Sequence, residues 1–220
     1  NLKEIIAPVV AGNFGCSPDQ LLFAGDRIES PDGGVSWEEA MRMMYEARVY
    51  PFAFGSFKAP DVSWNEHDGS GEPYFTYVYS CQAVELEVDV QSAKVTLLNI
   101  VAAHDVGKAV NPPMLKGQIY GGISQGIGMA LFEDLAVKEG LPGALNYNRY
   151  RIPKAADMPE ILPIIVENAD PTSPFGCKGI GEPALELIAP AIAGALYRAT
   201  GNAPDTLPIK TDEILKGLDL

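Results

Sequence analysis

The sequence is poor in positive charge and has no long apolar run. Lys and Arg number 16 against 29 Asp and Glu, which gives a formal net charge of −13 at pH 7. Nucleic acids and anionic membrane surfaces bind basic patches, so this charge argues against both partners. Pro, Gly or a charged residue interrupts each apolar run before the roughly 18 residues that a transmembrane helix needs. We therefore expect neither a nucleic-acid nor a membrane partner.

Cysteine and histidine are also scarce. Cys16, Cys81 and Cys177 are widely spaced, and no CxxC pair suggests a zinc ribbon or an iron–sulfur loop. Unpaired thiols fit a reducing compartment, which predicts a cytoplasmic protein. His67 and His104 are the only histidines, and neither has neighbours that would complete a set of three or four metal ligands. We expect both to be structural or surface residues.

What is present indicates a folded chain. The composition is 47% hydrophobic and 20% charged, which suits a protein with a buried core. We find no internal repeat or linker and treat residues 1–220 as a single unit. The chain begins with Asn1, and its opening "NLKEIIAPVVAGNFG" is not a signal peptide. We expect a piece of a longer protein that is incomplete without an upstream polypeptide.

The hydrophobic patterns predict an α+β fold with mixed or antiparallel strands and packed helices. Ser36 and Glu39 form a capping box that starts an amphipathic helix. The tail is expected to hold a short strand and a last helical turn. The other predicted elements are a helix over 2–12, a short strand between two turns in 16–34, a long loop over 51–72, an antiparallel hairpin from 73–90 and 93–107, a glycine-rich helix beginning near Asn111, a strand near 161–168 and a helix over 184–200.

Residues 117–128, "GQIYGGISQGIG", hold five glycines within the predicted helix. Each weakens a helix by about 1 kcal/mol relative to Ala, so the glycines must serve another purpose. A nucleotide loop is one interpretation, but no Lys-Ser/Thr follows. Close packing against another backbone or a flat cofactor fits better. Gln125 is the side chain in the tightest part that has both a donor and an acceptor.

Residues 175–196, "FGCKGIGEPALELIAPAIAGAL", place Glu182 between glycines and Pro183. Pro183 suits the first turn of a helix. An acidic residue there can be a structural partner of the helix dipole. The preceding glycines let a ligand approach the backbone, and a carboxylate beside a buried helix is expensive unless it has a function or a partner. The residues alone leave both interpretations open.

Two runs, "HDVGKAVNPPMLKGQIYGGISQGIGMALFED" and "GCKGIGEPALELIAPAIAGALYRATG", resemble the molybdenum-binding subunit of the xanthine dehydrogenase / aldehyde oxidase family of molybdenum hydroxylases. "AVELEVDVQSAKVTLLNIVAAHDVG" and "GCSPDQLLFAGDRI" also look like the C-terminal part of that subunit. The resemblance covers nearly the whole chain.

The resemblance implies that Glu182 is the general base, which takes a proton from the oxygen that attacks an electron-poor substrate carbon. It implies that Gln125 and Gly126 lie beside the molybdenum ligands and the pterin. It implies that the backbone of Lys178, Gly179, Ile180 and Gly181 approaches the cofactor. The pterin dithiolene would hold the molybdenum, so no protein ligand to the metal is expected.

The same resemblance implies partners. The molybdenum–molybdopterin cofactor would need the upstream half of the molybdenum subunit, and its mononucleotide and dinucleotide forms both stay open. Iron–sulfur clusters and FAD would lie on an iron–sulfur subunit and a flavin subunit. The small-molecule substrate would be an N-heterocycle, a purine or an aldehyde. The alternatives are a non-catalytic scaffold subunit of the same fold and, with less support, a nucleotide-binding module.

Overall fold

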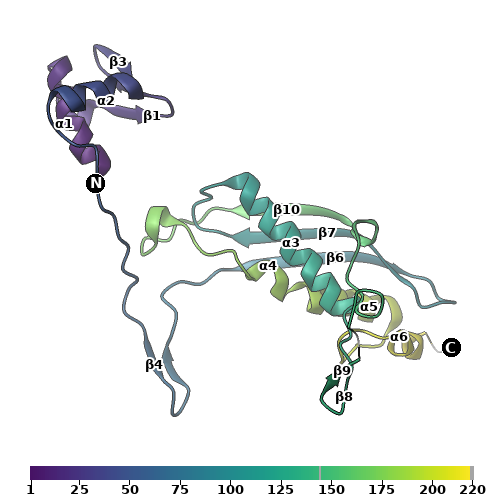
Figure 1. Ribbon diagram of the computed structural model, residues 1–220. Coiled ribbons are helices and arrows are strands. Elements are labelled where there is room, and N and C mark those ends of the chain that lie inside the picture. Colours follow the sequence, from purple (N-terminus) through teal and green to yellow (C-terminus); the bar gives the residue numbers. More distant parts are fainter. Residues whose placement is uncertain (144, 219–220) are drawn as a thin grey trace. The chain divides into compact units, whose positions relative to one another are not determined.

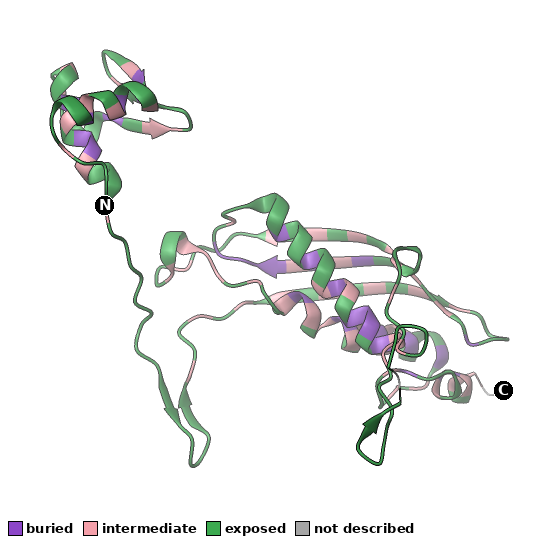
Figure 2. Ribbon diagram, viewed as in Figure 1, coloured by how far each residue is buried: buried purple, intermediate pink, exposed green. Residues whose placement is uncertain are grey.

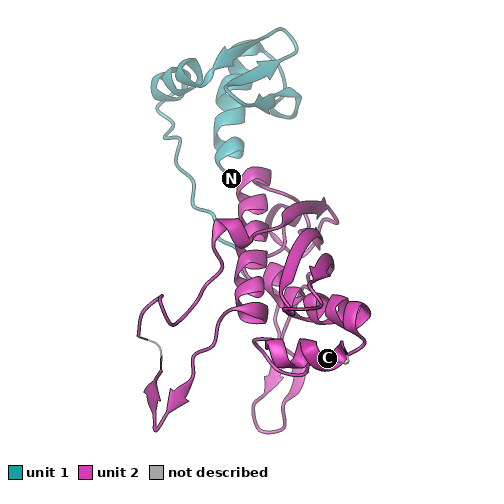
Figure 3. Cartoon of the chain, turned by 90° about the vertical axis from the view of Figure 1, so that its right-hand side faces the viewer, with its two compact units in different colours: residues 1–58 teal, residues 59–220 magenta. Residues whose placement is uncertain are grey.

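The computed structural model describes residues 1–143 and 145–218. The chain divides into two compact units, residues 1–58 and residues 59–220 (Figure 3). That residues 1–220 act as a single unit stays a prediction, because compactness does not establish how two units work together. Each unit is described by itself.

The first unit packs two helices with a small antiparallel sheet (Figure 1). Helix α1 spans Leu2–Phe14, and α2 spans Trp37–Glu46. The capping box predicted at the start of α2 is confirmed, because the Ser36 side chain accepts from the Glu39 N–H and the Glu39 carboxylate accepts from the Ser36 N–H. The sheet has the order β1-β2-β3, with β1 at Leu22–Ala24, β2 at Arg27–Ser30 and β3 at Gly33–Ser36.

The prediction of one short strand in 16–34 was therefore wrong in its count. Gly33 and Gly34 suggested a turn, yet both lie in β3, where Gly33 pairs with Ser30 and Gly34 with Glu29. Pairing with a neighbouring strand overrides the weak strand preference of glycine. A short 3₁₀ turn, η1, precedes the sheet at Pro18–Gln20.

The second unit is built on a mixed three-stranded sheet of order β10-β7-β6. Strands β6 (Ser80–Val88) and β7 (Val95–Asp105) form the predicted antiparallel hairpin. Strand β10 (Glu160–Val166) pairs with β7 in parallel. The mixed sheet and its helices confirm the α+β class.

Helices α3 (Pro112–Leu131), α4 (Pro183–Glu186) and α5 (Ile188–Thr200) bury their apolar side chains against this sheet. Figure 2 shows buried residues along α3 and β7. β7 supplies Ile100 and Ala102 to this core, α3 supplies its isoleucines, and α5 supplies Ile188, Ile192 and Leu196. The core thus fixes α3 beside the segment that begins α4, which is where the predicted site residues lie.

Three predicted elements differ in detail from those of the structure. The helix over 184–200 divides at Leu187 into α4 and α5. The long loop contains a small hairpin of β4 (Ser63–Asn65) and β5 (Ser70–Glu72). The strand expected in the tail is absent from the described residues. The Ile209 N–H donates instead to the Ala130 carbonyl oxygen near the end of α3, so a helix end provides the partner that a strand would have provided.

The remaining elements are short. They are β8 (Val137–Lys138), β9 (Leu141–Pro142), η2 (Ala155–Asp157), η3 (Pro174–Gly176) and α6 (Thr211–Gly217). Within the ranges that the structure describes, no helix combines the length and the apolar character needed to cross a membrane.

Candidate functional site

Glu182 is the residue immediately before α4, and its side chain is exposed. Its carboxylate makes no capping hydrogen bond to the helix. α4 has only four residues, so its dipole is small and offers little stabilisation to a charge. These observations weaken the interpretation of Glu182 as a structural helix partner.

In the segment that leads to Glu182, two glycines leave the backbone uncovered by side chains. A Cβ atom added at Gly179 or at Gly181 would find no heavy atom within 4 Å. Both glycines are exposed, and Ile180 between them is half-buried. The backbone of this stretch is therefore open to a ligand that approaches closely.

Helix α3 holds the same segment from the side. The Gln118 side chain donates from Nε2 to the Gly181 carbonyl oxygen at 2.9 Å. One turn further, a Cβ atom at Gly122 would lie 2.7 Å from the Ala184 Cβ, so only glycine allows the two backbones to come this close. The close packing predicted for the glycine-rich helix is confirmed at this contact.

Gly126 makes the next contact along α3. It is buried, and a Cβ atom there would lie 2.7 Å from the Ile188 Cβ. In the structure Gly126 therefore serves helix packing, and its predicted contact with a cofactor stays a prediction. Gln125, beside it, is exposed, and its side chain makes no hydrogen bond to another described residue. Its amide is available to a ligand.

Lys178 starts the segment with a buried side chain. Its Nζ lies 2.6 Å from Asp105 Oδ2, and the two side chains are 6% and 8% exposed. Burial raises the pKa of Asp105, but the hydrogen bonds from Lys178, the Gly107 N–H and Asn168, together with the charge of Lys178, outweigh it and hold the pKa below its ordinary value. The ammonium group of Lys178 is therefore committed to Asp105, and only the backbone of Lys178 is left to approach a ligand.

A second polar contact lies beneath α4. The Gln82 side chain donates from Nε2 to the Ala184 carbonyl oxygen at 2.9 Å, and the same nitrogen lies 3.2 Å from His104 Nε2. His104 is fully buried, and burial lowers its pKa. This confirms a structural histidine at 104, and His67 is exposed, as expected for a surface residue. Among the described residues, Gln82 Oε1 and His104 Nδ1 have no hydrogen-bond partner.

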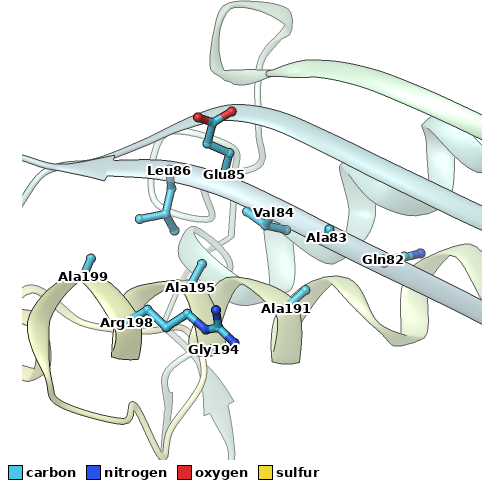
Figure 4. A pocket seen from close by; sticks show the side chains of 10 residues that line it. All are labelled: Gln82, Ala83, Val84, Glu85, Leu86, Ala191, Gly194, Ala195, Arg198 and Ala199. Carbon is cyan, nitrogen blue, oxygen red and sulfur yellow. The ribbon is translucent and has the colours of Figure 1, made fainter.

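Two pockets lie near these elements. One, of about 330 Å³, opens beside the segment that leads to Glu182, and its lining includes Gln118, Lys178, Ile180 and Gly181. The other, of about 620 Å³, lies between β6 and α5, where Leu86 points toward the helix and Glu85 away from it (Figure 4). None of the predicted site residues lines the second pocket.

The side chains that could bind a metal ion indicate what kind of cofactor the chain could hold. In the described ranges 1–143 and 145–218, no group of three or more His, Cys, Asp or Glu side chains could hold a metal ion. What the chain offers is bare backbone at Gly179 and Gly181, together with the unpaired polar side chains of Gln125 and Glu182. These features fit a flat organic group that carries its own metal ligands. That the metal is held by a pterin stays a prediction.

The structure thus brings Lys178–Gly181 and Glu182 alongside α3, near Gln118 and Gly122. It shows no hydrogen bond between Gln125 and Glu182. Sequence reasoning missed Asp105, Gln118 and Gln82. Gln118 could have been found, because it lies one turn before Gly122 on the face of α3 that contacts α4. Asp105 and Gln82 lie far from Glu182 in the sequence and gave no local signal.

Comparisons with known proteins identify the family of the chain. The family model described as "Molybdopterin cofactor-binding domain" matches residues 1–159, a span that includes Gln125 and Gly126 but not Glu182. The putative xanthine dehydrogenase molybdenum-binding subunit XdhA of Escherichia coli (strain K12) is 39% identical over 133 residues, which are 60% of this chain and 18% of XdhA.

Two further proteins match almost the entire chain. The aldehyde oxidoreductase molybdenum-binding subunit PaoC of Escherichia coli (strain K12) is 30% identical over 223 residues, which cover 99% of this chain and 28% of PaoC. The crystal structure of quinoline 2-oxidoreductase from Pseudomonas putida 86 superposes with a TM-score of 0.75 at 21% identity, over 99% of this chain and 28% of that one. The chain therefore spans well under a third of these relatives.

Proposed function

The chain belongs to the family of molybdopterin cofactor-binding domains, and from this premise we propose that it is the C-terminal part of a molybdenum hydroxylase subunit with Glu182 as the general base. The proposed reaction oxidises a carbon centre of an N-heterocycle, a purine or an aldehyde with oxygen derived from water. Molybdenum–molybdopterin, when bound, supplies the redox chemistry.

The observation that carries the proposal is the state of Glu182. A general base must reach the proton that it removes, within about 2.6–3.2 Å, and its carboxylate must be free to accept it. The Glu182 carboxylate is exposed and makes no capping hydrogen bond, and it ends a segment whose backbone is bare at Gly179 and Gly181. A carboxylate that serves only the fold would be expected to use its oxygens for a cap or an ion pair.

The chain's own residues then have separate tasks. Glu182 accepts the proton of the attacking oxygen on its carboxylate. Gln125, with an amide that is free to donate and accept, orients the bound group. The backbone of Lys178–Gly181 forms the surface that this group approaches. The contacts of Gln118 with Gly181 and of Gly122 with Ala184 keep Glu182 in place relative to α3.

The partners follow from the same premise. We propose that the upstream half of the molybdenum subunit completes the cofactor site, and that iron–sulfur clusters and FAD reside on other subunits or domains. The name of PaoC describes a molybdenum-binding subunit, which supports an assembly of this kind. We propose a cytoplasmic location for the assembled enzyme.

The test is the variant Glu182→Gln in the assembled enzyme, with molybdenum content measured beside turnover. Gln keeps nearly the same shape and hydrogen-bonding reach but cannot accept a proton at neutral pH. We expect the variant to fold, assemble and hold molybdenum, and to lose at least about 10²-fold in kcat, which is the lower end of what a general base contributes.

Glu186→Gln is the matched control. Glu186 is an exposed glutamate at the other end of α4, so the same chemical change there should leave turnover unaltered. A metal-replete Glu182→Gln enzyme that works near the wild-type rate would overturn the proposed mechanism. It would then favour a base located elsewhere in the assembled enzyme.

A further inference from the structure

The ion pair of Asp105 and Lys178 joins the end of β7 to the segment that precedes Glu182. The two charged groups are 2.6 Å apart, and each side chain is more than nine-tenths buried. Burying two charges is expensive, and a pair of well-packed apolar residues is often at least as stable. Stability alone is therefore a weak explanation for a buried pair at this place.

The backbone around the pair is held in register by further contacts. The Lys178 N–H donates to the Val106 carbonyl oxygen, and the Lys108 N–H donates to the Gly176 carbonyl oxygen, each at 2.8 Å. Gly107, between them, has a φ of +63°, and a Cβ atom there would lie 2.2 Å from the Gly176 oxygen. Only glycine permits this approach, so Lys178 is fixed against the end of β7.

The path from Lys178 to Glu182 is short and contains two glycines. Gly179 and Gly181 have wide conformational freedom, and neither has a neighbour within 4 Å of a Cβ position. Such a segment keeps one conformation only if it is held at both ends. Gln118 holds the far end at the Gly181 oxygen, and Gln82 holds the Ala184 oxygen beyond Glu182. The near end depends on Lys178.

We propose that Asp105 is a positioning residue for Glu182 and that it acts through Lys178. Its carboxylate binds the Lys178 ammonium group and so fixes where the glycine segment begins, which in turn fixes the direction in which the segment delivers Glu182. The inference rests on the proposed function of Glu182, and it assigns to Asp105 no contact with substrate or cofactor.

The competing explanation is that the pair only stabilises the fold, and a set of three variants separates the two. Asp105→Asn keeps an oxygen for the Gly107 N–H but removes the charge. Lys178→Met removes the ammonium group and keeps the length of the side chain. The double variant removes both charges and so leaves no unpaired buried ion. Its unfolding midpoint should therefore lie closer to the wild-type value than the midpoint of either single variant.

The variants are measured in the assembled, molybdenum-replete enzyme, with kcat and KM normalised to molybdenum content. A displacement of about 1 Å at a reacting group can lower the rate about 10²-fold. We expect each single variant to lose roughly 10- to 100-fold in kcat with little change in KM. The kcat of the double variant should stay low, although its unfolding midpoint returns toward the wild-type value. If its kcat returns together with its midpoint, the pair is structural and the proposal is overturned.

Hydrogen exchange of the 176–186 segment provides a readout that does not depend on turnover. The segment should exchange faster in all three variants, including the stable double variant, because the near end loses its side-chain contact and keeps only its backbone hydrogen bonds. Unchanged exchange in the double variant would contradict the proposal. The matched control is Asp134→Asn with Lys210→Met, which removes an exposed pair with a separation of 3.7 Å. This control should change neither exchange in 176–186 nor kcat.

The two proposals can fail separately. If Glu182→Gln retains full turnover, the function proposed for Glu182 fails, whatever the exchange data show. If Glu182→Gln is inactive but the double variant of Asp105 and Lys178 has wild-type kcat and exchange, the base is supported and the positioning role of Asp105 is rejected.

Discussion

Gln125 and Glu182 differ in what each side chain can do with a proton. An amide donates and accepts hydrogen bonds but cannot act as a base at neutral pH, whereas an ionised carboxylate can accept a proton from a reacting group. Both side chains are exposed on neighbouring elements and are free to meet a ligand. If both lie at one reaction centre, their loss should therefore have unequal consequences.

We expect Gln125→Ala to lower turnover less than Glu182→Gln, because a hydrogen bond that positions a group assists the reaction without performing the proton transfer. The measurement is kcat per molybdenum in the assembled enzyme. Gln91→Ala, in the exposed turn between β6 and β7, is the control and should have no effect. Equal and near-complete loss in the Gln125 and Glu182 variants, with molybdenum retained in both, would contradict this order.

The element that decides the geometry of the site is α3, and four of its five glycines fall on two faces. Gly122 and Gly126 face α4 and α5, where a Cβ atom would overlap Ala184 or Ile188. Gly117 and Gly121 are exposed and have open space around them. The first face explains why a helix weakened by glycine is tolerated, because it brings two backbones into close contact. The second face has no such role within the described residues.

This difference predicts opposite effects on stability. Gly126→Ala should lower the free energy of unfolding by about 1–3 kcal/mol, because the new methyl group must push α5 away. Gly121→Ala should raise it by up to about 1 kcal/mol, because Ala is the better helix former and meets no neighbour. Urea denaturation of the chain, followed by circular dichroism, measures both. Midpoints that shift in the same direction would show that the contact with Ile188 does not govern the packing.

At the scale of the whole molecule, the proposed function gives this chain one part of a cofactor site. Its open backbone and its two free polar side chains belong to the second unit, and it spans only 28% of the length of PaoC. A flat cofactor that lay on this surface alone would leave its other face in water. Affinity for such a group would therefore be low, since most bound ligands bury the greater part of their surface.

We expect residues 1–220 alone to bind the molybdenum cofactor poorly and to need another polypeptide. The measurement is molybdenum per chain after purification, compared for the isolated chain and for the assembled protein. A monomeric 1–220 protein that retained one molybdenum per chain would contradict this expectation. If the assembled protein also lacked molybdenum, the scaffold alternative would gain support.

Local sequence patterns were sufficient for most elements. The Ser36–Glu39 box, the alternation in 80–88 and 95–105, and the Asn-Pro start of α3 each act within a few residues, so their structure follows from local chemistry. Strand pairing was harder to predict. β10 pairs with β7 across more than fifty residues of intervening chain, and the glycines of β3 become strand only because β2 lies beside them.

The sequence by itself determined which residues are candidates, because Glu182 stands between glycines and Pro183, and Gln125 lies within the glycine-rich run. Only the tertiary structure decided how they are held. Asp105 reaches Lys178 across 73 positions and Gln82 reaches Ala184 across 102, and each contact exists because the sheet and helices bury these side chains together. Burial and pairing depend on every element that surrounds a residue. A local sequence pattern can therefore predict a candidate general base, but the fold determines which contacts hold it in place.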